Sequence, residues 1–397
     1  ARHVRRRAPR ADGGGVTDGI RRSRAGLFTA FAGLGVTAAF VPAIIPSAER
    51  AIGGDLSTAV PALFAGLLVG VLMSGPLLMR RPPRTALVLG SALQAAAIVA
   101  VAVAGTPAVF LSAAVVAGLG FGVVEASGSV AAKSLSVGSA TGLLSALLGT
   151  VAVCAAVTPL IVAAGAGARP VLGVLAIVPL LTIAMLAGSV FPDARTAAPA
   201  RRDVRGLLVL LPFAVALPLY VGVETVLSGW SAVIPERILE VDPGLAALGT
   251  SAFWALMAVG RFGTAALRRL SVSPITILAS ATSAAAILMA TAGLLVGSAP
   301  VGALVALAAV VVLLAPSYGL ILGLALDRLD PARSAAVTGA LVACGAVGGT
   351  FVPALILLIG RDPASSTTFL VSAALCALVP ALVLIAGRSR QRASSTS

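Results

Sequence analysis

Residues 207–235 read LLVLLPFAVALPLYVGVETVLSGWSAVIP, and this stretch contains a single charged residue, Glu224. A helix needs about 20 consecutive apolar residues to cross a hydrocarbon layer roughly 30 Å thick, and this stretch is long enough. A lone carboxylate in such a segment is costly unless it faces a polar interior. The stretch therefore predicts a membrane-spanning helix that presents one acid to a functional site.

Comparable apolar runs recur along the whole chain of 397 residues, of which 59% are hydrophobic and 11% charged. Ordinary soluble domains contain about a quarter charged residues. The runs do not alternate apolar and polar positions as barrel strands do, so we expect an all-α integral membrane protein. Twelve spans are predicted, at residues 25–48, 55–79, 85–104, 107–132, 141–164, 170–190, 207–234, 244–267, 274–296, 300–326, 335–359 and 366–387.

The longest hydrophilic interruption, FPDARTAAPARRDVRG, lies near the middle of the chain and separates six spans from six. A similar feature follows the second span of each half: GVLMSGPLLMRR ends at Arg81 and GRFGTAALRR ends at Arg269. An offset of about half the chain indicates a duplicated six-helix unit, and hence two pseudo-symmetric bundles. The expected parts are a disordered basic arm (1–24), an N-terminal bundle (25–190), a linker (191–206), a C-terminal bundle (207–387) and a tail (388–397).

The net charge of +14 is distributed unevenly. Of the 28 Lys and Arg, 23 fall in the arm, the tail and the loops that share a side with both termini. Only Arg50, Arg169, Arg237 and Arg361 fall in the opposite loops. The positive-inside rule then places both termini in the cytoplasm and the chain in the inner (cytoplasmic) membrane, embedded in the lipid bilayer. The membrane orientation explains the basic charge, so we expect no nucleic-acid partner. We also expect the protein to be a monomer.

The sequence offers little material for catalysis. Cys154, Cys344 and Cys376 are scattered through apolar spans without metal-ligand spacing, and the only histidine, His3, lies in the arm. No phosphate-binding loop of the GxxxxGK[ST] type occurs. We expect no cofactor and no enzyme activity: a membrane-embedded transferase would need an acidic or histidine-containing loop motif, and a channel would need a charged or carbonyl-rich filter.

Two acidic residues, Glu125 and Glu224, lie deep within predicted spans. Because apolar surroundings penalise the ionised form, each is a candidate to carry a proton while one bundle moves against the other. A purely structural role, with each glutamate hydrogen-bonded to neighbouring Ser or Thr side chains, stays open. Arg261 and Asp327 are candidates for an inner gate, although helix ending and charge anchoring explain them equally well. The candidate residues of the substrate cavity are Gln94, Ser129, Tyr220, Thr225 and Tyr318.

Small residues and prolines predict further features. Gly118 and Gly122 lie four residues apart, a spacing typical of close helix contact in membranes. Pro316 and several other prolines are expected to break or kink their helices. Tyr220 lies one helical turn from Glu224, whereas Trp230 is turned away and is expected to anchor the helix at the membrane interface.

The two six-helix halves resemble the major facilitator superfamily and, within it, the fucose and proton symporter group. GFGVVEASGS, residues 120–129, resembles that group's fourth-helix pattern, in which the glutamate matched by Glu125 is implicated in sugar binding and transport. YVGVET (220–225) and GRFGTAALRR (260–269) look like its seventh- and eighth-helix segments. The resemblance implies a proton-coupled secondary active transporter that moves a sugar-like molecule by alternating access.

The sequence also departs from that group. A first-helix aspartate carries proton coupling there, but the corresponding AAFVPAIIPS (38–47) has no acid, and Ser129 replaces a fourth-helix asparagine. The chain contains no asparagine at all, and amides are usual partners of sugar hydroxyls. This inventory fits an apolar or amphipathic substrate better, so a proton-driven exporter of an amphipathic drug or metabolite remains the alternative.

Overall fold

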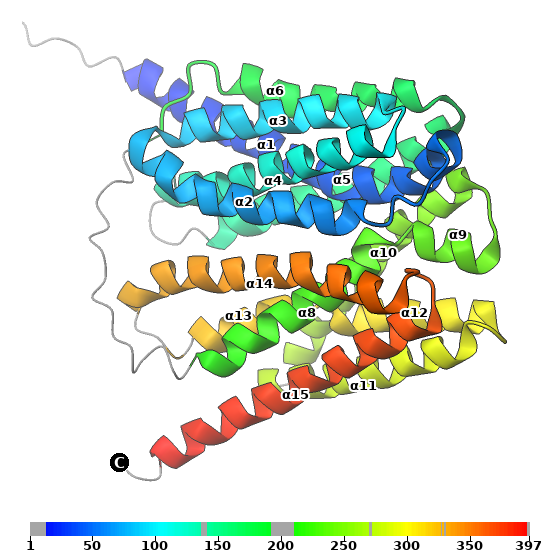
Figure 1. Cartoon of the computed structure of the whole chain (residues 1–397). Helices are drawn as coiled ribbons and strands as arrows, with labels where there is room; N and C mark the ends of the chain where they lie inside the picture. Colours follow the sequence, from blue (N-terminus) through cyan, green and yellow to red (C-terminus); the bar gives the residue numbers. More distant parts are fainter. Residues whose placement is uncertain are drawn as a thin grey trace, which may run out of the picture.

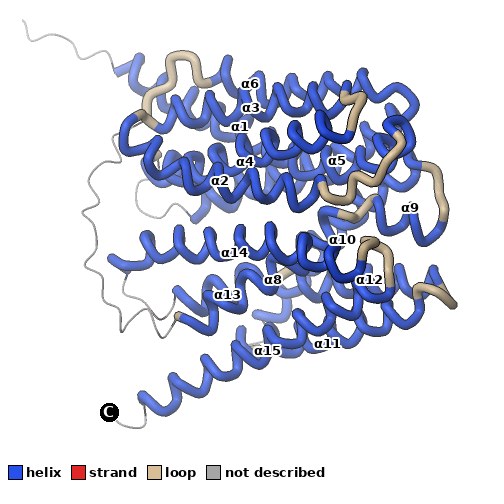
Figure 2. Tube along the Cα trace, viewed as in Figure 1, coloured by secondary structure: helices blue, strands red, loops and turns tan. Residues whose placement is uncertain are grey.

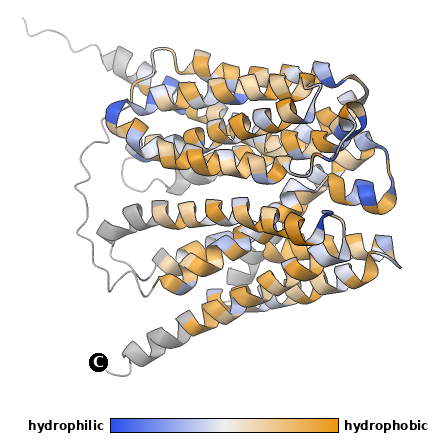
Figure 3. Cartoon of the chain, in the orientation of Figure 1, coloured by the Kyte–Doolittle hydropathy of each residue, from blue (hydrophilic) through white to orange (hydrophobic). Residues whose placement is uncertain are grey.

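The computed structural model describes residues 13–135, 141–191, 210–269, 272–326, 328 and 331–394. These residues form helices and connecting loops, with no strand among them (Figure 2). Twelve helical segments are long and apolar enough to cross a membrane, which confirms the predicted number. Hydrophilic residues gather near the helix ends and the helix middles are mainly apolar (Figure 3).

The first six spans pack together in one half of the molecule (Figure 1). They comprise α1 (Gly13–Ile52), α2 (Ala59–Arg80), α3 (Pro83–Val103), α4 (Pro107–Ser134), α5 (Thr141–Gly165), the 3₁₀ helix η1 (Ala166–Ala176) and α6 (Ile177–Met185). Helix α4 packs along both α2 and α3, and α1 packs against α5 and α6.

The last six spans form the other half of the molecule (Figure 1). They comprise α8 (Leu211–Gly229), α9 (Val233–Leu239), α10 (Pro243–Arg269), α11 (Pro274–Leu295), α12 (Pro300–Leu314), α13 (Ser317–Leu326), α14 (Pro331–Gly360) and α15 (Ser366–Ser394). The two bundles meet mainly where α2 faces α14 and where α1 and α5 face α10.

Helix α1 begins earlier than expected, so residues 13–24 are helical where disorder was expected. Ser23 explains this difference. Its buried hydroxyl donates to Gly19 O (2.9 Å) and to Val190 O (2.7 Å), which holds the first turns of α1 against the chain that follows α6. Residues 1–12 of the expected arm and most of the expected linker lie outside the described residues.

Two spans are interrupted where proline removes a backbone donor. The tenth span breaks at Ala315 and Pro316 into α12 and α13, as predicted. The sixth span starts as the 3₁₀ helix η1, which contains Pro170 and a non-helical residue, Ala168. Pro42, Pro46, Pro218 and Pro353 lie inside continuous helices instead.

Glycines bring α2 and α4 into backbone contact, which confirms the close approach predicted from Gly118 and Gly122. A Cβ atom added at Gly118 would collide with the carbonyl oxygen of Leu63, and one added at Gly122 would collide with that of Leu67. Gly66 and Gly70 of α2 face the backbone of α4 in the same way. Only glycine permits this separation, and tight van der Waals packing replaces the hydrophobic effect as the attraction between helices in lipid.

Candidate functional site

The two bundles are tied together at the end that carries α9, opposite the end at which α1 begins (Figure 1). We call it the α9 end. The Arg237 guanidinium nitrogens lie 3.2 Å from Glu49 Oε1, 3.2 Å from Asp55 Oδ1 and 2.9 Å from Asp362 Oδ1. Glu49 and Asp55 belong to the first bundle and Arg237 to the second, so this cation links the bundles.

Arg50 of the first bundle makes the reciprocal contacts. It lies 3.6 Å from Glu236 Oε1 and 3.6 Å from Asp242 Oδ2, and it donates to Val241 O at 3.0 Å. We call Arg50, Arg237 and their five carboxylates the α9-end network. Ser251 of α10 adds a hydrogen bond of 2.8 Å to Ala156 O of α5. These hydrogen bonds and ion pairs all cross the bundles at the α9 end or in the helix halves next to it.

Trp230 also joins the bundles, and its predicted role as an interfacial anchor was wrong. The indole is fully buried, and its Nε1 donates to Ser57 O at 3.0 Å. Gly229 beside it packs so closely on Val60 that a Cβ atom there would collide. Trp230 lies just past the end of α8, where the turn toward α9 directs its ring at the first bundle.

Burial and charge act in opposite directions on the groups around Arg237. Burial tends to raise the pKa of Asp55, but hydrogen bonds from Ser57 and the positive charge of Arg237 bring the pKa below its ordinary value. Burial tends to lower the pKa of Arg237, but the hydrogen bond to Asp362 and the charges of Glu49 and Asp55 raise it on balance. Burial raises the pKa of Glu49, although the backbone N–H of Leu56 and the charge of Arg237 act in the opposite direction. The cation therefore favours the charged form of Asp55 more strongly than that of Glu49.

Five of the predicted residues come together between the bundles, and we call them the central cluster: Glu125, Tyr220, Glu224, Arg261 and Tyr318. Glu224 lies within electrostatic range of Arg261 and beside the Tyr220 hydroxyl. Tyr318 lies within electrostatic range of both carboxylates. Glu125 comes from α4 of the first bundle, whereas Glu224 and Tyr318 come from α8 and α13 of the second.

The side chains of the central cluster differ in exposure. Tyr220 is almost completely buried, and its hydroxyl has no hydrogen-bond partner. Glu125, Glu224 and Tyr318 are half-buried, and Arg261 is exposed. Within the described part of the chain, neither glutamate forms an ion pair. The cluster therefore offers two carboxylic acids, one cation and the Tyr318 phenol to a molecule that enters between the bundles.

Three other predicted residues lie apart from the central cluster. Gln94 is fully buried within the first bundle, where its Oε1 accepts a hydrogen bond of 3.0 Å from Thr37. Thr225 is buried and faces Gly349 of α14. Ser129 is exposed on α4, one turn beyond Glu125. Asp327, the predicted gate partner of Arg261, lies outside the described residues.

Gln94 has a structural place, so its replacement should leave transport intact. Gln94→Met removes an acceptor of Thr37, but the Thr37 hydroxyl keeps its hydrogen bond to Gly33 O at 2.9 Å, and a buried amide nitrogen without a partner is removed as well. These effects nearly cancel, so the free energy of unfolding should change by less than about 1 kcal/mol. Thermal unfolding in detergent and uptake by proteoliposomes check this. Lost uptake with unchanged stability would return Gln94 to the substrate cavity.

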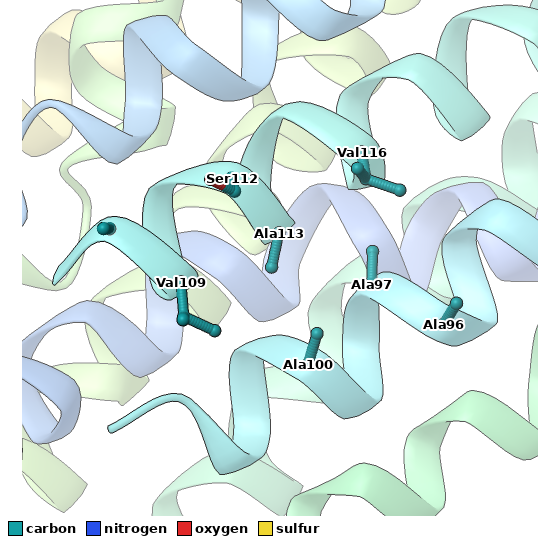
Figure 4. A pocket seen from close by; sticks show the side chains of 8 residues that line it. Ala96, Ala97, Ala100, Val109, Ser112, Ala113 and Val116 are labelled. Carbon is teal, nitrogen blue, oxygen red and sulfur yellow. The ribbon is translucent and has the colours of Figure 1, made fainter. Parts of the chain in front are cut away.

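A separate hollow of about 420 Å³ lies between α3 and α4 (Figure 4). Alanine and valine side chains line most of it, and Ser112 is its only polar residue. It opens on the surface of the first bundle and contains no residue of the central cluster. Because charged or convergent polar groups are absent from its lining, the central cluster remains the candidate site.

No protein family model and no curated protein matches the sequence. Solved structures do match. A D-xylose–proton symporter gives a TM-score of 0.78 at 14% identity, over 92% of this chain and 97% of that chain. The fucose:proton symporter of E. coli gives 0.62 at 16% identity, over 93% and 99%. An inward-facing bacterial homologue of the human lysosomal transporter Spinster gives 0.73 at 12% identity, over 95% and 98%.

This likeness shows that the chain has the twelve-span fold of the major facilitator transporters, as the sequence led us to expect. The named structures are all membrane transporters. The solved structures do not favour the fucose symporter group over other transporters of this fold. The D-xylose symporter and the Spinster homologue both give higher TM-scores than the fucose symporter.

Sequence reasoning missed the α9-end network. The positive-inside argument counts Lys and Arg only, and it assigned Arg50 and Arg237 merely to outer loops. Six of the 14 acidic residues cluster in those same loops: Glu49, Asp55, Glu236, Glu240, Asp242 and Asp362. This excess of acid around isolated arginines was the available signal.

Proposed function

We propose that the chain is a secondary active transporter that moves a small organic molecule across the cytoplasmic membrane by alternating access, as a monomer coupled to protons. The fold supports this proposal, as do the polar ties that join the bundles at the α9 end. With both termini cytoplasmic, as the charge distribution predicts, the α9 end faces outward. The conformation is then closed to the outside, and the central cluster is reached from the cytoplasm.

One observation carries the coupling proposal: Tyr318 lies within electrostatic range of Glu125 from one bundle and Glu224 from the other. Two acids from different bundles thus act on one tyrosine, so movement of one bundle against the other changes the surroundings of both. When the bundles close around it, an ionised carboxylate loses its contact with water, which is costly in a low dielectric. A proton removes that cost, so protonation of the acids permits the bundles to reorient.

The resemblance to sugar symporters and the two sugar-symporter structures favour a sugar-like substrate. The described part of the central cluster contains no amide, which instead favours the alternative, a proton-driven exporter of an amphipathic drug or metabolite. The two alternatives share the same fold and coupling residues. They differ in the direction of net flux and in the class of ligand that binds.

Proteoliposomes with an imposed pH gradient test this function, using D-xylose, L-fucose and the amphipathic dye ethidium as probes. One pH unit concentrates a neutral substrate about tenfold when one proton is coupled. Glu125→Gln and Glu224→Gln should each reduce this accumulation to the level without a gradient, while exchange of labelled substrate continues. Glu240→Gln is the matched control, because Glu240 is exposed at the end of α9. Wild-type accumulation by both Gln variants of the central cluster would disprove the coupling proposal.

A further inference from the structure

Arg261 lies within a candidate membrane span and has few interaction partners among the described residues. It belongs to the candidate span Pro243–Gly263 of α10. A guanidinium group has five N–H donors, yet within the described residues Arg261 makes one hydrogen bond, from Nε to Ala315 O at 3.4 Å, and no ion pair. A cation at such a position is costly unless it meets a counter-ion or water, so intramembrane arginines usually mark a site.

The surroundings of Arg261 favour an anion. Ala315 lies at the break between α12 and α13, and the ten-residue helix α13 begins just after it at Ser317. Free N–H groups at the start of a helix attract negative charge. The buried Ser317 hydroxyl has no hydrogen-bond partner among the described residues, and the Tyr220 hydroxyl lies close to the Glu224 carboxylate and to the backbone N–H of Tyr318.

The other charged and titratable groups around this point are few. Glu224 and Tyr220 come from α8, Tyr318 from α13, and Glu125 from α4 across the bundle boundary. Helices α14 and α15 also pack against α8, but their described side chains include no charged residue. Among the described carboxylates, Glu224 is the one that interacts electrostatically with Arg261, and the two do not form an ion pair in this conformation.

We propose that Arg261 binds a carboxylate group of the substrate, so that the transported molecule is an organic anion. This inference rests on the proposed transport function and narrows its substrate class. A guanidinium binds a carboxylate through two parallel hydrogen bonds. An ionised Glu224 repels the same carboxylate, whereas a protonated Glu224 can donate a hydrogen bond to it. Binding of the anion and binding of a proton to Glu224 therefore strengthen each other by the same factor.

This arrangement explains how one site couples two cargoes. The anion neutralises Arg261 and the proton neutralises Glu224, so the loaded site carries no net charge from this pair. With only one cargo bound, the pair leaves a net charge in a closing apolar interface. The charges of the pair also cancel in the empty site, so the bundles reorient most readily when both cargoes are bound or when neither is, as co-transport of an anion and a proton requires.

Ligand-induced stabilisation of the purified full-length protein tests the assignment. The probes are matched pairs that differ in the carboxylate: glucuronate against glucose, and phenylacetate against phenylacetamide. At least one carboxylate should raise the unfolding temperature in detergent while its neutral partner does not, with higher affinity at pH 5.5 than at pH 8. Arg261→Gln should weaken the apparent affinity about ten- to a hundred-fold, as loss of charge-assisted hydrogen bonds predicts. Arg84→Gln, at an exposed arginine at the start of α3, is the control and should keep the wild-type response.

Glu224→Gln provides a second test, in which the measured quantity is the pH dependence of carboxylate binding. A merely structural role of Arg261 would not link this pH dependence to Glu224. Because glutamine imitates the neutral acid, this variant should still bind the carboxylate but should lose the difference between pH 5.5 and pH 8. Equal stabilisation by charged and neutral partners, or no Arg261-dependent stabilisation by either carboxylate, overturns the assignment.

The same probes separate this inference from the proposed function. If a neutral probe drives proton flux in proteoliposomes and the carboxylates do not, the transporter proposal stands and the anion assignment fails. If a carboxylate binds through Arg261 without moving protons, the anion assignment stands and the proton-coupling proposal fails.

Discussion

Gly118→Ala should be strongly destabilising, although alanine is the better helix former. A Cβ atom at this position would collide with the carbonyl oxygen of Leu63 and would lie 2.8 Å from Leu67 N, both in the backbone of α2. Backbone atoms cannot rotate away as a flexible side chain can, so α2 and α4 would have to separate along their glycine contact. Overpacking of this kind costs about 3 kcal/mol or more. We expect a lower unfolding temperature in detergent and a lower yield of folded protein.

The matched control for this change is Gly149→Ala in α5. Gly149 lies in a helix interior, and no atom lies within 4 Å of an added Cβ at this position. There the change should be neutral or should stabilise the protein by up to about 1 kcal/mol, because glycine is a poor helix former. If Gly118→Ala were as stable as the control, the close approach of α2 and α4 would not hold in the membrane.

The architecture could be predicted because membranes impose a simple rule. Each span must satisfy its own backbone hydrogen bonds, so every long apolar run becomes a helix, and the number of runs gives the number of spans. The residues that differed from expectation are those with specific long-range partners. Ser23 extends α1 through its contact with Val190, which lies 167 residues away in the sequence, and no local pattern reports that partner.

The candidate site was predictable only in part, for the same reason. Isolated acids deep within apolar spans identified Glu125 and Glu224, because the bilayer makes such residues expensive. Arg261 was expected at an inner gate with Asp327, which lies outside the described residues. Helical spacing placed Tyr220 beside Glu224, and the structure agrees. Gln94 is also a polar residue in an apolar span, so the sequence suggested a place in the substrate cavity. A polar side chain in a span can bind a neighbouring helix as readily as a ligand, and Gln94 accepts a hydrogen bond from Thr37 of α1.

Arg237→Gln should open the α9 end of the protein. The change leaves Glu49 and Asp55 of the first bundle, and Asp362 of the second, without their common cation. These side chains are partly exposed, so we expect a loss of about 1–3 kcal/mol from the closed form, which shifts the ratio of closed to open molecules about 5- to 150-fold. The pKa of Asp55 lies below its ordinary value, so its contribution is present at neutral pH and is lost only as the pH falls through that lowered pKa.

Spin labels on Ala51 of α1 and Leu239 of α9 report this opening, since both residues are exposed and lie on opposite sides of the contact. In a background without native cysteines, the distance distribution should gain a longer component in Arg237→Gln. Arg361→Gln removes a positive charge from the same end but breaks no ion pair among the described residues, so it should keep the parent distribution. A closed distribution in Arg237→Gln would mean that the ion pairs of Arg50, together with Trp230 and the glycine contact beside it, hold the bundles together without Arg237.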